Sequence, residues 1–170
     1  MDGDSDSSIG DISSLAIKNE LHRGYQHEDH LLLGSSGALA DLSRFHPDPV
    51  QIFRLWQIYL ENVDPLFKVT HGITLQARII EATTNINSIS PAMEALMFGI
   101  YCIAITSLNP NDCRAAFGSS KEDLLRSYRA GCQHALANAK FLQSQDRDCL
   151  TALFLYLVSV SGALRGGSKR

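Results

Sequence analysis

The chain has 170 residues, of which 45% are hydrophobic and 19% charged, and its formal net charge is -3. A single domain of this length buries about 70% of its unfolded surface, so the composition favours one packed core. The sequence pI near 6.0 disfavours direct binding to DNA or RNA, because nucleic-acid-binding domains generally carry clustered Lys and Arg.

Residues 1–44 are rich in Asp, Ser and Gly. Such a composition buries too little apolar surface to offset the entropy lost on ordering, so we predict an acidic linker or disordered arm. Its start lacks the basic and apolar parts of a secretory signal, which favours a protein that stays inside the cell. Two apolar groups within it, Leu31–Leu33 and Leu39–Leu42, are candidates to dock on the folded part.

The most metal-like residues of the chain lie in this arm: His22, His27, Glu28, Asp29 and His30. Two histidines four apart on one helix can share a zinc ion, but His27 and His30 are three apart. We therefore predict a solvated polar segment here.

The next residues, 34–37, read Gly-Ser-Ser-Gly. A nucleophile elbow needs a serine centred between glycines on a strand-to-helix turn, so this segment is interpreted as a flexible loop.

The first predicted helix follows Asp48, whose carboxylate can accept a hydrogen bond from a first-turn amide, and Pro49 suits the first helical position. Its inward stripe is Ile52, Leu55, Trp56, Tyr59 and Val63. Trp56 on this stripe is interpreted as a core residue rather than a ligand platform.

A second helix is predicted from Thr74, with the apolar spacing Leu75, Ile79, Ala82 and Ile86 packed against the first helix.

Ser90 then caps a third helix, with Pro91 at its first position and Glu94 in its first turn. This helix has no polar face, which predicts a central position. Its expected core residues are Leu96, Phe98, Ile100, Tyr101 and Ile103.

After a short helix that ends near Gly118, two overlapping capping patterns open a long helix, Ser119 with Glu122 or Ser120 with Asp123. The expected inward face of the long helix is Leu124, Tyr128, Cys132, Ala135, Ala139 and Leu142. We expect four polar side chains to face solvent: Arg126, Arg129, Gln133 and Lys140.

The last predicted helix lies in the apolar run Cys149–Leu164. This run is shorter than the roughly 20 residues that cross a bilayer, so it is interpreted as a buried helix. Its expected inward residues are Leu150, Leu153, Phe154, Leu157, Val160 and Leu164.

No alternating strand pattern occurs, so the predicted fold is all-α, an irregular array of antiparallel helix pairs with a disordered N-terminal arm. The expected domain comprises residues 45–164, and residues 165–170 form a basic, Gly-rich tail.

The segment from Arg44 to Ser161 resembles the amino-terminal part of the regulatory middle domain of fungal zinc binuclear cluster transcription factors. The matching residues are His46, Pro47, Leu55, Trp56, Glu61–Pro65 and Lys68–His71. The resemblance implies an irregular helical array and a nuclear role, possible control of a secondary-metabolite gene cluster, and a middle domain that runs further than this chain. The six-cysteine DNA-binding cluster of the family is absent.

The four cysteines, Cys102, Cys113, Cys132 and Cys149, are scattered without a C-x-x-C pair, so they are interpreted as buried thiols in a reducing compartment. We expect no catalytic, cofactor-binding, metal-binding or DNA-binding residue and no cofactor. The expected partners are other transcription regulators or a second copy of the chain, with no membrane. The expected location is the nucleus by resemblance, and otherwise the cytoplasm.

An alternative hypothesis is a small helical enzyme or ligand carrier with a pocket between helices. Its candidate residues are His46, His71 and His134, each of which could serve as an acid or base beside a carboxylate. Converging polar side chains in a pocket would favour this alternative. A third hypothesis is a remnant with no activity of its own.

Overall fold

The computed structural model describes residues 41–162, all of which lie in one unit, Gly37–Arg170. Every regular element in this range is helical, which confirms the all-α fold class. In chain order the elements are η1 (Ser43–Phe45), α2 (Pro49–Asn62), α3 (Asp64–Phe67), α4 (Gly72–Thr84), η2 (Ile86–Ser88), α5 (Pro91–Ser107), α6 (Pro110–Phe117), α7 (Lys121–Asn138) and α8 (Arg147–Ser161). The first 40 residues of the predicted arm, with their histidines and the Gly-Ser-Ser-Gly segment, lie outside the described residues, as do Leu164 and the tail.

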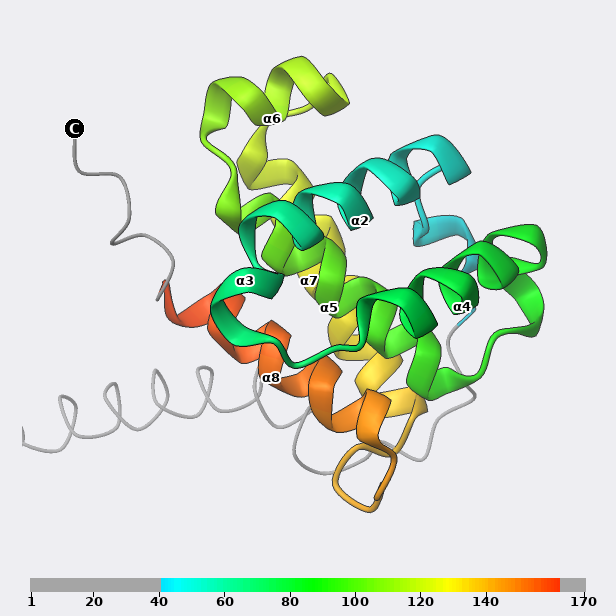
Figure 1. Ribbon diagram of the computed structural model, residues 1–170. Helices are drawn as coiled ribbons and strands as arrows, with labels where there is room; N and C mark the ends of the chain where they lie inside the picture. Colours follow the sequence, from blue (N-terminus) through cyan, green and yellow to red (C-terminus); the bar gives the residue numbers. More distant parts are fainter. Residues whose placement is uncertain (1–40, 163–170) are drawn as a thin grey trace, which may run out of the picture. The chain divides into compact units, whose positions relative to one another are not determined.

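Helix α5 is the central element of this unit, and its closest helical neighbours are α8, α7 and α2 (Figure 1). Nearly all of its side chains are buried, as expected for a helix without a polar face. The five core residues predicted from the sequence are all among them: Leu96, Phe98, Ile100, Tyr101 and Ile103.

The contacts of α7 give the directions of the helices. Ala95 near the start of α5 lies against Cys132 late in α7, and Thr106 near the end of α5 accepts a hydrogen bond from Lys121 at the start of α7. The two helices are therefore antiparallel. Since α8 runs back along α7, α5 and α8 run parallel, and Gly99 of α5 lies against Ala152 of α8.

The predicted caps form as expected. Asp48 accepts a hydrogen bond from the Gln51 amide at 3.0 Å, and Ser90 accepts one from the Met93 amide at 3.2 Å. For α7 the structure selects the second capping pattern, because Ser120 accepts from the amide of Asp123 at 3.1 Å. Each bond satisfies an amide that has no partner inside its helix.

The apolar stripes of α2 and α4 are buried as predicted, except that Ile86 lies in η2 beyond the end of α4 and is only partly buried. Helix α4 begins at Gly72, two residues before the predicted start. Leu42 is already buried in the same core, 2% exposed. The core therefore extends to the first residues that the structure describes.

The predicted inward face of α7 is partly wrong. Leu125 and Leu136 are buried, whereas Leu142 lies beyond the helix and is 60% exposed. Arg129 and Gln133 do not face solvent, because Arg129 donates to the backbone carbonyl of Ser159 and Gln133 donates to the hydroxyl of Tyr156 on α8.

The predicted inward face of α8 is largely wrong. The buried residues are Cys149, Ala152, Leu155, Tyr156 and Ser159, and most of the predicted inward residues are exposed instead. Three of the buried residues are small, which lets α8 approach α5 at Gly99, where an added Cβ would lie 3.2 Å from the carbonyl oxygen of Ala152. Close approach, rather than side-chain volume, therefore selects the buried face.

Within residues 41–162, no helix is both long and apolar enough to cross a membrane.

Candidate functional site

The outward side of α8 is an exposed apolar surface. We call Leu150, Phe154, Leu157 and Val160 the α8 outer face. Their side chains are 53%, 39%, 54% and 50% exposed. Their spacing of three and four residues places them in one stripe along the helix. Grouped exposure of this kind marks interaction surfaces more often than single exposed hydrophobic residues do.

Helix α3 contributes to the same surface. The rings of Phe67 and Phe154 meet edge to face with centroids 5.5 Å apart, a favourable aromatic geometry. Leu66, next to Phe67, is 64% exposed. The apolar surface thus extends from α8 to the short helix that follows α2.

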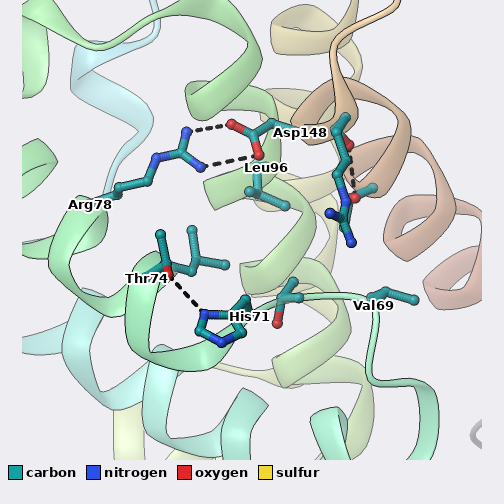
Figure 2. Close-up of a pocket in the computed structure, with 10 residues that line it drawn as sticks. Val69, His71, Thr74, Arg78, Leu96 and Asp148 are labelled. Atoms are coloured by element: carbon teal, nitrogen blue, oxygen red, sulfur yellow. Dashed lines mark hydrogen bonds and ion pairs between the residues drawn. The ribbon is translucent and has the colours of Figure 1, made fainter.

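A hollow of about 170 Å³ lies between α8 and α4. Figure 2 shows Arg78 of α4 reaching Asp148 of α8 with both terminal nitrogens, an ion pair that joins the two helices. Below it, Nδ1 of His71 lies 2.8 Å from the hydroxyl of Thr74. Arg147 and Thr151 also line the hollow, so polar side chains do converge here.

This hollow is a weak candidate for a ligand site. Pockets that hold small organic ligands measure roughly 300–1,000 Å³, and this one is smaller. Its best anion-binding group, the Arg78 guanidinium, is already neutralised by Asp148, which raises the pKa of Arg78 further. The ion pair between Arg78 and Asp148 therefore fits a structural role, because it joins α4 to α8.

The three candidate histidines do not share a site. His71 lines the hollow of Figure 2, whereas His46 and His134 do not. His134 lies exposed on α7, as expected for a surface residue.

His46 is a buried link between the segment before α2 and the central helix. Its side chain is 2% exposed. Nδ1 lies 3.1 Å from the hydroxyl of Tyr101, Nε2 lies 3.4 Å from a carboxylate oxygen of Glu94, and its ring is 4.5 Å from that of Phe98. All the polar atoms of the ring have partners on α5, so we assign His46 a structural role.

The four cysteines are free and fully buried, as the sequence predicted. Burial raises the pKa of the Cys113 and Cys149 thiols, and the pKa of Cys132 lies well above its usual value because of its hydrogen bond with Cys102 and its burial. Such thiols are poor nucleophiles. Residues 41–162 contain no group of three or more His, Cys, Asp or Glu that could hold a metal ion.

Sequence reasoning missed the α8 outer face because it assigned these residues to the core. One feature of the sequence could have indicated an exposed apolar face on this helix. The run Cys149–Leu164 is apolar on every side of a helix and contains two complete apolar stripes. A helix at the edge of a bundle can bury only one of them.

The sequence is similar to fungal transcription regulators. It is 56% identical over 135 residues to Transcriptional regulator AacuB of Aspergillus aculeatus. The aligned segment covers 79% of this chain and 18% of that protein. It is 41% identical over 115 residues to Aurofusarin cluster transcription factor aurR2 of Gibberella zeae, covering 68% of this chain and 17% of the other.

A third relative is named for a C6 finger domain. The C6 finger domain transcription factor adaR of Aspergillus niger is 34% identical over 126 residues, covering 73% of this chain and 16% of that protein. The chain therefore spans less than a fifth of the length of each of these relatives. No protein-family model matches the sequence, and no solved structure matches it.

Proposed function

Because this chain belongs to the family of fungal cluster transcription regulators, of which it matches one segment, we propose that it regulates transcription in the nucleus by binding other proteins. The domain that carries this role is the helical region within residues 45–164, flanked by an N-terminal linker and a basic tail.

The observation that carries the proposal is the α8 outer face. It carries four large apolar side chains, 39–54% exposed, and one of them, Phe154, contacts Phe67 of α3. Protein partners bury surfaces of this kind, whereas DNA backbones bind clustered cations. From residue 149 to residue 164 the sequence contains no charged side chain at all. The surface thus favours a protein partner over nucleic acid.

The proposed target is a gene cluster for a secondary metabolite. The support for this step is the name of one relative, which is called an aurofusarin cluster factor, and of another, which is called a pyriculol/pyriculariol biosynthesis cluster factor.

The test uses the native host. Deletion of the gene is expected to change the transcripts of neighbouring biosynthetic genes several-fold, and the wild-type chain should restore them while a fluorescent fusion of it enters nuclei. Leu157→Glu, which places a charge in the α8 outer face, should fail to restore them. The matched control is Ile73→Glu on α4, because Ile73 is 83% exposed but lies outside the face. Unchanged transcripts after deletion would refute the proposal.

The enzyme or carrier alternative is not favoured. The hollow of Figure 2 is small, Arg78 in its lining is paired with Asp148, and two of the three candidate histidines lie elsewhere. A purified chain that converted a small molecule, with loss of activity in His71→Ala, would reverse this preference.

A further inference from the structure

A second and larger hollow, of about 570 Å³, lies where α5 begins and α7 ends. The residues around η1 and η2 complete its wall. We call it the Glu94 hollow, after a residue of the first turn of α5 that lines it. Its volume lies within the range of roughly 300–1,000 Å³ that is usual for pockets that hold small organic molecules.

Three of the residues that line the Glu94 hollow are charged, and one of them is largely buried. Asp41 and Arg44 are exposed, and their opposite charges balance each other. The side chain of Glu94, by contrast, is 14% exposed. The net charge of the lining is therefore that of one largely buried carboxylate, which attracts a cation.

The Glu94 carboxylate has hydrogen-bonding capacity to spare. Within residues 41–162 its partner is Nε2 of His46, at a distance of 3.4 Å. Nδ1 of His46 lies 3.1 Å from the hydroxyl of Tyr101, so the ring is held at both nitrogens. An ionised carboxylate can accept about four hydrogen bonds, and burying it is costly unless donors satisfy it. A ligand with several donors on one positive group would meet this need.

We propose that the Glu94 hollow binds a small organic amine, with the ammonium group on the Glu94 carboxylate and the carbon skeleton against Ile86 and Ile89. An ammonium group supplies both the positive charge and several N–H donors. The two isoleucines are partly buried and Leu42 beside them in the lining is 2% exposed, so the skeleton meets an apolar wall. This inference goes beyond the proposed function, because it gives a protein-binding regulator a small-molecule ligand.

An NMR titration of the full chain, labelled at the isoleucine methyl groups, tests the site. The probe is 2-phenylethylamine, and 2-phenylethanol is its neutral analogue of nearly the same shape. The methyl signals of Ile86 and Ile89 should shift and saturate with the amine, with a Kd on the order of 1 mM for a ligand of about nine non-hydrogen atoms. The alcohol should bind about tenfold more weakly, because it lacks the charge.

The variant Glu94→Gln removes the charge and keeps the size of the side chain. It should weaken binding of the amine by about tenfold to a hundredfold, the range expected for hydrogen bonds to a charged group. Glu122→Gln is the matched control, because Glu122 is exposed on α7 and does not line the hollow. Circular dichroism and thermal melting check that each variant folds. If Glu94→Gln fails to fold, Ile89→Trp, which reduces the space in the hollow, replaces it and should also abolish binding.

Two results would overturn the proposal. One is the absence of saturable shifts at Ile86 and Ile89, or equal shifts with the amine and the alcohol. The other is equal affinity of the wild type and Glu94→Gln for the amine, which would mean that the carboxylate does not hold the ammonium group. The proposed function is judged separately, by the transcripts in the native host.

Discussion

At the scale of single residues, α7 approaches α5 closely at Gly131. A Cβ added to Gly131 would lie 2.5 Å from a ring carbon of Phe98. That ring cannot move aside freely, because it is fully buried and packs against His46 and Tyr101. Glycine at position 131 is therefore required by space, although glycine within a helix costs roughly 1 kcal/mol relative to alanine.

We predict that Gly131→Ala lowers the free energy of unfolding by about 1–3 kcal/mol, since overpacking outweighs the gain in helix propensity. Urea denaturation followed by circular dichroism measures the change. Gly72→Ala is the matched control, because the nearest side-chain atom to its added Cβ, on Leu60, is 3.6 Å away. Equal stability of Gly131→Ala and the wild type would contradict the packing described for Phe98.

The buried thiols lead to a second prediction at this scale. All four cysteines are fully buried, and the pKa of Cys132 is well above its usual value because of its hydrogen bond with Cys102 and its burial. A disulfide reagent such as dithionitrobenzoate should therefore modify none of them within minutes in the native protein, and all four after denaturation. Ile73→Cys should add one rapidly reacting thiol. Rapid stoichiometric reaction of the unmodified native chain would show that a cysteine is accessible.

At the scale of elements, the starts of α2, α5 and α7 each depend on one side chain. Ser120 caps α7, and its hydroxyl also donates to the carboxylate of Asp123 at 2.7 Å. Asp48 caps α2 and Ser90 caps α5, and each accepts a hydrogen bond from a backbone amide in the first turn of its helix. These bonds involve residues three apart, so the local sequence specifies them.

We predict that Ser120→Ala destabilises the protein by about 1 kcal/mol, the usual cost of losing an N-cap. Ser119→Ala is the matched control and should change stability by less than about 0.5 kcal/mol. Chemical denaturation of the two variants side by side measures the difference. A larger loss for Ser119→Ala would mean that the other capping pattern is the one in use.

At the scale of the whole molecule, four tyrosines couple stability to alkaline pH. Burial raises the pKa of Tyr59, Tyr101 and Tyr156, and it raises the pKa of Tyr128 to about 12. A raised pKa means that the folded state holds the phenol proton more tightly than the unfolded state. The stabilising contribution is complete below the unfolded pKa of about 10 and is lost as pH rises towards the folded pKa.

We predict that the free energy of unfolding falls steeply between pH 10 and pH 12, with Tyr128 contributing up to about 2 kcal/mol of the loss. Tyr128→Phe removes one titrating group from a ring that remains buried, so its stability should decline less steeply over the same range. Urea denaturation at pH 8, 9.5 and 11 compares the two proteins. An equal decline in the free energy of unfolding of the wild type and Tyr128→Phe would show that Tyr128 does not contribute to the pH dependence.

The association of the molecule also belongs to this scale. One face of α8 packs on α5 and α7, and the opposite face carries Phe154 and Leu157 into solvent. The buried face stabilises the unit. We propose that the unit binds its protein partner through the α8 outer face. Both roles fall on one helix because apolar side chains lie on two of its sides.

The sequence alone determined the all-α class, the caps at Asp48 and Ser90, the stripe of α2 and the central position of α5. These features depend on residues close in the chain or on a helix with no polar side, so local patterns specify them. The tertiary structure decided which side of α8 is buried and gave Arg129 and Gln133 their partners. That choice depended on the close approach of α5 at Gly99, which favours small side chains over large ones. No pattern within α8 contains this information, because its two apolar stripes satisfy the helical period equally well and only the neighbouring helices distinguish them.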